Sequence, residues 1–124
     1  MRSNLTNWQW QGYARNHKNP LNLMLHVFVV PIFWVGTMLI PSALFLGDAA
    51  VWIGGIFMAI SVALQGLGHR MEEAPPEPFK GFGDFLSRIL VEQYVTFPRF
   101  VVSGGWSRAA MGGGDETDDP PTDP

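Results

Sequence analysis

The sequence predicts an all-α integral membrane protein, built as a transmembrane helical hairpin with an interfacial N-terminal segment and a C-terminal amphipathic helix. Two stretches, residues 19–47 and 49–69, contain no Asp, Glu, Lys or Arg, although charged residues make up 15% of the chain. A bilayer core about 30 Å thick needs roughly 20 apolar residues per helix, so each stretch is long enough to cross it. Gly47 and Asp48 between them favour a tight turn. The alternative is a soluble protein with two buried helices, but 124 residues leave little polar chain to cover them.

The N-terminal half contains the interfacial segment and the first span. Residues 5–17 are aromatic and polar, and their tryptophans and tyrosine suit the membrane surface. The first span is expected at about residues 21–46. Pro20 fits the first turn of this helix, where a missing N–H costs nothing. Pro31 and Pro41 lie inside the span and are expected to kink it.

The C-terminal half contains the second span and the amphipathic helix. The second span is expected at about residues 49–69, followed by the loop "EEAPPEPFKGFG". Residues 82–103 mix charges with large apolar side chains, which favours a helix lying on the membrane or packing against the hairpin. Residues 1–110 would then form a single membrane domain. The acidic, proline-rich tail at 111–124 is expected to be disordered.

Composition and charge restrict the location and the partners of the chain. The sequence has no cysteine, which excludes disulfides and thiolate metal sites, and it has no basic stripe for nucleic acid. Basic residues precede the first span and follow the second, whereas the turn between the spans has none. The positive-inside rule therefore places both termini in the cytoplasm. We expect an integral protein of a bacterial inner membrane, with the lipid bilayer as a partner, assembled as a homo-oligomer or within a larger membrane complex.

The three histidines are expected to converge at one end of the hairpin. His26 lies as many residues before the centre of the turn as His69 lies after it. Antiparallel helices with the same rise per residue would place these two imidazoles at the same depth. His17 precedes the first span and lies on the same side of the membrane. Glu73 would share a face with His69 if the second helix continued for one more turn.

Histidine nitrogen with carboxylate oxygen is a ligand set suited to Fe(II), Zn(II) or Mn(II). We therefore predict a metal site formed by His17, His26, His69 and Glu73. Tyr13, Asn22 and Gln65 are candidates for outer-shell groups that fix the histidine tautomers. The alternative is that the histidines are structural and hydrogen-bond to backbone carbonyls or to a neighbouring helix.

Two segments, "YARNHKNPLNLMLHVFVVP" and "QGLGH" with a nearby Glu, resemble a known family. This family comprises small membrane proteins related to the "metabolism of phytosphingosine to odd-numbered fatty acids" protein. The resemblance covers about residues 13–79. The positions that match the family pattern are Tyr13, His17, Pro20, Asn22, His26, Pro31, Gln65, Gly68, His69 and Glu73.

The resemblance implies an iron(II)-dependent membrane dioxygenase that shortens 2-hydroxy fatty acids by one carbon, in an α-oxidation route. Fe(II) would be the cofactor, and a fatty-acid-like molecule would be the substrate. Lys18 or Arg70 is expected to meet the substrate carboxylate. A rival hypothesis is a non-catalytic accessory subunit that packs on a larger membrane complex. A third is a haem protein with His26 and His69 as axial ligands.

Overall fold

The computed structural model describes residues 3–112, and this part of the chain is helical without any strand. The helices are α1 (Leu5–Tyr13), α2 (Pro20–Leu46), α3 (Ala49–His69), α4 (Phe82–Val91), the π-helical segment η1 (Glu92–Thr96), α5 (Phe97–Val102) and α6 (Gly105–Ala110). The expected all-helical class is confirmed for the described residues. The predicted disordered tail lies outside them, apart from its first two residues.

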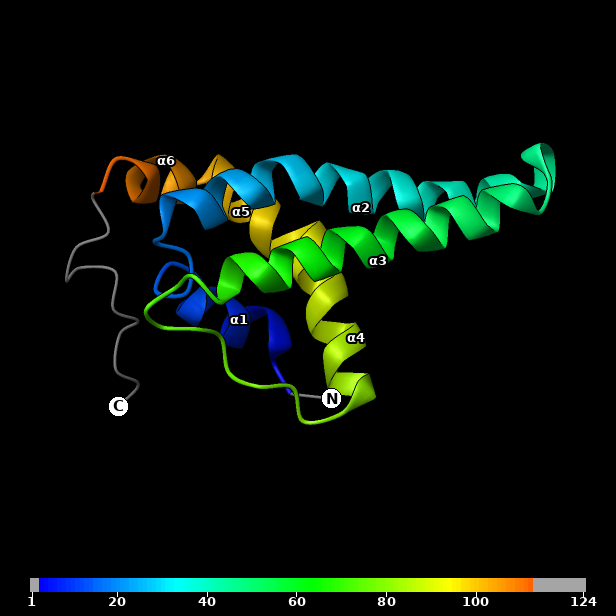
Figure 1. Ribbon diagram of the computed structural model, residues 1–124. Helices are drawn as coiled ribbons and strands as arrows, with labels where there is room; N and C mark the ends of the chain where they lie inside the picture. Colours follow the sequence, from blue (N-terminus) through cyan, green and yellow to red (C-terminus); the bar gives the residue numbers. More distant parts are fainter. Residues whose placement is uncertain (1–2, 113–124) are drawn as a thin grey trace.

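Helices α2 and α3 form a long antiparallel pair joined by a short turn (Figure 1). The helix α2 begins at Pro20, with the Asn19 side chain accepting hydrogen bonds from the first backbone N–H groups, and it runs through Pro31 and Pro41 without interruption. The bounds of α2 and α3 agree to within one residue with the two spans predicted from the sequence.

The backbones of the two long helices come into direct contact at a pair of glycines. A Cβ added to Gly36 would lie 2.7 Å from the carbonyl oxygen of Gly54, and one added to Gly54 would lie 2.6 Å from the carbonyl oxygen of Gly36. No L side chain fits at such distances, so both positions must lack a Cβ for the backbones to meet. Small residues permit the same close packing in helices that associate within membranes.

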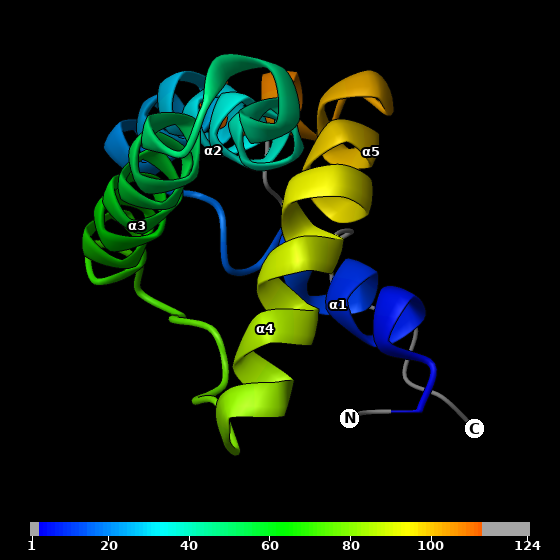
Figure 2. The ribbon, with the colours of Figure 1, turned by 90° about the vertical axis from the view of Figure 1, so that its right-hand side faces the viewer.

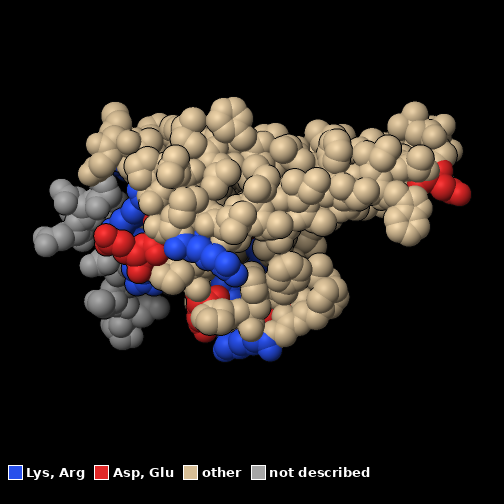
Figure 3. Space-filling model, in the orientation of Figure 1, with Lys and Arg blue, Asp and Glu red and all other residues tan. Residues whose placement is uncertain are grey.

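Helices α2 and α3 are long and apolar enough to cross a membrane. Large apolar side chains near the turn are freely accessible, including Leu44, Phe45 and Trp52, which are 88%, 91% and 75% exposed. A soluble monomer rarely exposes so much contiguous apolar surface. Charged atoms gather instead at the opposite end, beside α1 and α4, on the face that Figure 3 shows.

The C-terminal helices pack against one side of the α2–α3 pair (Figure 2). Helices α4, η1 and α5 follow one another directly, so residues 82–102 form a continuous helical rod. The core beneath it includes Tyr13, Leu23, Val30, Phe97 and Phe100. Packing against the long helices, one of the two arrangements expected for the amphipathic helix, is therefore observed for η1, whereas α4 packs on α1.

Candidate metal centre

The three histidines come from three separate parts of the chain and meet in one cluster. His17 lies in the loop between α1 and α2, His26 lies near the start of α2, and His69 is the last residue of α3. Their ring centroids are 4.8 Å apart for His17–His26, 4.8 Å for His17–His69 and 5.0 Å for His26–His69. The rings are steeply inclined to one another, at 85°, 82° and 73°, so they face a common point instead of stacking.

Backbone carbonyls fix the orientation of two of these rings. The Nδ1 atom of His17 lies 2.8 Å from the carbonyl oxygen of Tyr13, and Nδ1 of His26 lies 2.9 Å from that of Asn22. A carbonyl oxygen only accepts, so Nδ1 must carry the proton in each ring. In the neutral imidazole the lone pair then lies on Nε2, which faces the cluster. Metal-binding histidines are commonly held in this way.

The fourth member of the cluster is Glu92, the first residue of η1. Its Oε1 atom lies 3.5 Å from Nε2 of His17, 3.3 Å from Nε2 of His26 and 3.8 Å from Nε2 of His69. One ligand atom from each of the four residues lies within 4.8 Å of the others. Adjacent ligand atoms at 2.0–2.2 Å from one ion are roughly 3 to 3.5 Å apart, so the contacts of Glu92 with His17 and His26 match this spacing, whereas its contact with His69 is slightly longer.

The cluster has lone pairs without donors to match them. Both Nε2 of His17 and Nε2 of His26 are buried, and within residues 3–112 neither has a hydrogen-bond partner. They face a carboxylate, which also offers only lone pairs when ionised. Buried polar atoms in native proteins are nearly always satisfied. A cation among these atoms would satisfy all of them at once, so the donor set fits a metal ion.

The ionisation states of the groups outside the long helices favour this arrangement. Burial lowers the pKa of the His17 imidazole to about 4, so this ring is neutral near pH 7. Burial raises the pKa of the Glu92 carboxyl, but hydrogen bonds with the three facing imidazoles, which need a proton on the ring nitrogen when no metal is bound, outweigh burial and hold the pKa well below its ordinary range. Glu92 is therefore an anion at neutral pH. A neutral imidazole and a carboxylate are the forms that bind metals.

Glu73, which the sequence predicted as the carboxylate ligand, is not in this cluster. The prediction required α3 to continue for another turn, but α3 ends at His69 and the chain turns away. Glu73 is exposed in the loop that follows. Its neighbour Glu72 is buried and accepts hydrogen bonds from the backbone N–H groups of Lys18 and Asn19, at distances from 2.9 to 3.0 Å. Glu72 thus ties the end of α3 to the beginning of α2.

Two of the predicted outer-shell residues contact the cluster, and the third acts farther away. The hydroxyl of Tyr13 donates to Oε1 of Glu92 at 3.0 Å, and its ring stacks on His17 with centroids 3.8 Å apart. Asn22 supplies the carbonyl that orients His26, and its side-chain amide donates to Glu72 at 2.8 Å. Gln65 makes its side-chain hydrogen bonds with Ser61 and Gln93.

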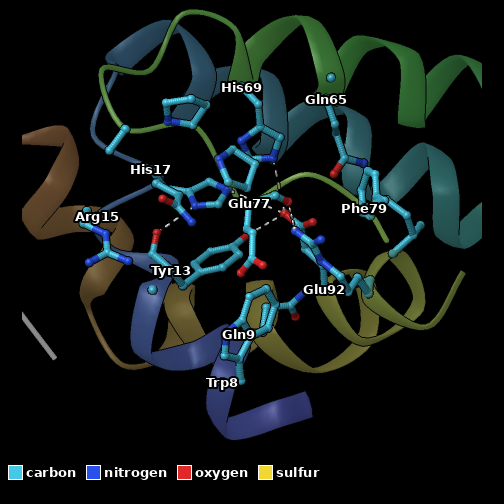
Figure 4. Close-up of a pocket in the computed structure, with 18 of the residues that line it drawn as sticks. Trp8, Gln9, Tyr13, Arg15, His17, Gln65, His69, Glu77, Phe79 and Glu92 are labelled. Carbon is cyan, nitrogen blue, oxygen red and sulfur yellow. Dashed lines mark hydrogen bonds and ion pairs between the residues drawn. The ribbon is translucent and has the colours of Figure 1, made fainter. Parts of the chain in front are cut away.

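A cavity of about 710 Å³ opens beside the cluster. His17, His69 and Glu92 form part of its wall, as Figure 4 shows. The side chain of His69 is 16% exposed, whereas that of His26 is fully buried, so the cluster is reached from the His69 side. Apolar and aromatic side chains cover much of the remaining wall, namely Trp8, Val62, Phe79, Phe85 and Ile89.

The two residues predicted to meet a substrate carboxylate differ in position. Arg70 follows His69 and lines the cavity together with Arg15. Lys18 is exposed, and the cavity wall is formed by other residues. Of the two predicted cations, Arg70 is therefore the one that lies beside the cluster.

The geometry does not suit a haem held between His26 and His69. Axial ligands occupy opposite faces of a planar macrocycle, with the iron between them. Here the ring centroids are only 5.0 Å apart. Oε1 of Glu92 lies within 3.8 Å of both Nε2 atoms, and this leaves no space for a porphyrin.

Glu92 was missed because its charge was interpreted as a sign of surface exposure. The mixture of charged and apolar residues at 82–103 suggested a helix on the membrane or against the hairpin, and Glu92 was counted among its surface charges. In the structure Arg88 is 5% exposed, stacks on Phe79 with its guanidinium carbon 4.3 Å from the ring centroid, and pairs with Asp84 at 3.4 Å. No spacing in the sequence relates Glu92 to the three histidines.

Comparison with protein-family profiles, curated proteins and solved structures finds no match to this chain. The resemblance described above therefore stays a prediction. A function is inferred below from the residues of the cluster and the cavity.

Proposed function

We propose that this chain is an iron(II)-dependent oxygenase of a membrane, acting on an acidic, lipid-like substrate. The observation that carries the proposal is the convergence of three imidazoles and one carboxylate beside a large cavity, with two buried Nε2 atoms that lack hydrogen-bond partners in the described chain. His17, His26, His69 and Glu92 would hold the ion. Histidine and carboxylate ligands suit Fe(II) among the divalent metals, and a bound ferrous ion would supply the means to activate O2.

The residues around the cluster have separate roles in this proposal. Tyr13 donates to Glu92 and keeps its carboxylate turned toward the histidines. The carbonyls of Tyr13 and Asn22 place the proton of the neutral ring on Nδ1 of His17 and His26, which leaves Nε2 as the ligand atom. Arg70 and Arg15 would attract the acidic group of the substrate. The aromatic wall of the cavity would cover an acyl chain and exclude water from the reacting end.

The reaction proposed is cleavage of the C1–C2 bond of a 2-hydroxy fatty acid. The substrate and O2 would give an acid one carbon shorter, CO2 and water. Removing four electrons from the substrate matches the four that reduce O2 to the level of water, so no further reductant is needed. This choice of substrate rests on the family resemblance, and the cavity supports only the broader class of acidic amphiphiles.

The direct test uses the protein purified in mild detergent and supplied with Fe(II). O2 uptake should match the loss of a long-chain 2-hydroxy acid and the release of CO2. His26→Ala and Glu92→Gln should abolish turnover, while Glu73→Gln should keep it within about two-fold, because Glu73 lies outside the cluster. Arg70→Gln should raise KM for the acid more than it lowers kcat. Substrate-independent O2 uptake, or none by the iron-loaded wild type, would contradict the proposal.

A further inference from the structure

A pair of buried glutamine side chains lies next to the metal cluster and joins α3 to η1. Gln65 is 3% exposed and Gln93 is 0% exposed. Nε2 of Gln65 donates to Oε1 of Gln93 at 3.0 Å, and Nε2 of Gln93 donates to Oε1 of Gln65 at 2.8 Å. Gln65 also donates to the hydroxyl of Ser61 at 3.0 Å. Both hydrogens of the Gln65 amide are therefore used.

Gln93 is also held through its backbone. The indole N–H of Trp34 on α2 donates to the carbonyl oxygen of Gln93 at 2.8 Å. Ser61 in turn donates to the carbonyl oxygen of Val29 on α2 at 2.6 Å. The residue directly after Glu92 is thus bound to both long helices, by its side chain to α3 and by its carbonyl to α2.

Glu92 and Gln93 occupy a π-helical turn, Glu92–Thr96. In an α-helix, neighbouring side chains point about 100° apart, so turning the rod by one residue would remove Glu92 from the histidines. Within this turn Glu92, Gln93 and Thr96 are all buried. Single π-turns inside helices occur often at functional sites. Within this widened turn two neighbouring polar side chains are both buried: Glu92 faces the histidines, and Gln93 bonds to Gln65.

We infer that Gln65 and Gln93 are positioning residues that fix the rotation and height of η1, so that Glu92 faces the three histidines. An apolar pair would fill the same space but would allow the rod to slide or turn, whereas two reciprocal hydrogen bonds are satisfied in only one register. The inference rests on the metal centre proposed above. Neither glutamine touches the cluster, so neither is a catalytic residue.

The test compares metal affinity in four proteins by competition with a chelator. These are the wild type, the double variant Gln65→Met/Gln93→Met, Glu92→Gln, and the triple variant that combines all three substitutions. Because the two amides bond to each other, replacing both leaves neither with a missing partner. Methionine also has a shape similar to glutamine, so the double variant should fold. We expect the double variant to bind Co(II) about ten- to a hundred-fold more weakly, as for other outer-shell changes, with altered visible absorption of the bound ion.

The triple variant separates positioning from general stability. If the amides act through Glu92, their loss should add less than about two-fold once Glu92 is already Gln. The inference would be overturned if the two glutamine substitutions lowered metal affinity equally in the wild type and in Glu92→Gln. It would also be overturned if a folded double variant kept the affinity and absorption of the wild type. Either result would leave the metal centre intact. A wild type that takes up no metal would overturn both.

Tyr94→Phe provides the matched control. Tyr94 lies in the same π-turn, but it is 48% exposed and its hydroxyl contacts Thr37 on α2. Its loss should leave metal affinity at the wild-type value, which shows that a change in η1 alone does not disturb the site. A loss as large as that of the double variant would overturn the specific role of the amides. Gln65→Met alone, with Gln93 left unpaired, should be at least as damaging as the double variant.

Discussion

Whether the histidine cluster can bind a metal ion depends on which nitrogen of each imidazole carries a proton. Two backbone carbonyls settle this for His17 and His26 by accepting from Nδ1. The Nε2 atoms of both rings face Glu92, so either a proton or a metal ion between the rings and the carboxylate would satisfy them. Glu92 lies within reach of all three imidazoles and Glu73 does not, so Glu92 is the acidic ligand that we propose.

Substitution of the two glutamates distinguishes these assignments. Glu92→Gln removes the charge in the cluster and should lower metal affinity by at least about a hundred-fold, beyond the range of outer-shell changes. Glu73→Gln changes an exposed residue and should alter affinity by less than about two-fold. Isothermal titration of the detergent-solubilised proteins with Zn(II) measures both. A larger loss of metal affinity in Glu73→Gln than in Glu92→Gln would instead support Glu73, the ligand predicted from the sequence.

The stability of the metal-free protein should fall on acidification. The pKa of His17 is lowered by burial to about 4, and that of Glu92 is held well below its ordinary range, so the unfolded chain binds more protons than the folded one. Stability therefore rises with pH between about 4 and 6.5. Thermal midpoints measured across this range should fall toward pH 4, and less steeply in His17→Gln. A midpoint that stays level in the wild type would contradict the burial of a neutral His17.

At the scale of elements, the long helices could be predicted well and the rod at residues 82–102 only in part. The uncharged stretches and the turn at Gly47 and Asp48 determine α2 and α3, and equal spacing from this turn correctly predicted that His26 and His69 meet. No such symmetry relates Glu92 to the hairpin, because a loop of irregular structure precedes α4. A π-turn also leaves no periodic signal in the sequence.

The glycine contact between α2 and α3 gives a prediction with an internal control. Gly54→Ala would place a Cβ 2.6 Å from the Gly36 carbonyl, and the helices would have to separate. Overpacking of this kind costs about 1–3 kcal/mol, more than the roughly 1 kcal/mol that Ala gains over Gly in a helix. Gly55→Ala meets nothing within 4 Å in the described structure and should be neutral or slightly stabilising. Thermal unfolding in detergent compares them, and equal midpoints would contradict the close contact.

At the scale of the whole molecule, charge and apolar surface are segregated. The arm formed by α2 and α3 is apolar apart from Asp48 at its turn, and most of the charges seen in Figure 3 lie at the end that holds the cluster. We propose that the arm crosses a membrane, with the cluster and both termini on the cytoplasmic side. The distribution of basic residues before and after the arm supports this orientation.

The absence of cysteine from the chain makes the orientation measurable. Asp48→Cys places a single thiol at the turn, and Met111→Cys places one beyond α6, at a residue that is 78% exposed. In bacterial spheroplasts a membrane-impermeant maleimide should label the first variant directly and the second only after lysis. Labelling of both from one side, or recovery of the protein in the soluble fraction, would contradict the spanning arrangement.

The central claim is that His17, His26, His69 and Glu92 bind one transition-metal ion. Metal analysis of the wild-type protein, extracted in mild detergent and equilibrated with Fe(II) without oxygen, tests it most directly. We predict one iron ion per chain after removal of free metal, and less than about a tenth of that in His69→Ala. A folded wild-type chain that retains no iron, and no Zn(II) or Mn(II) when these are supplied instead, would contradict the claim.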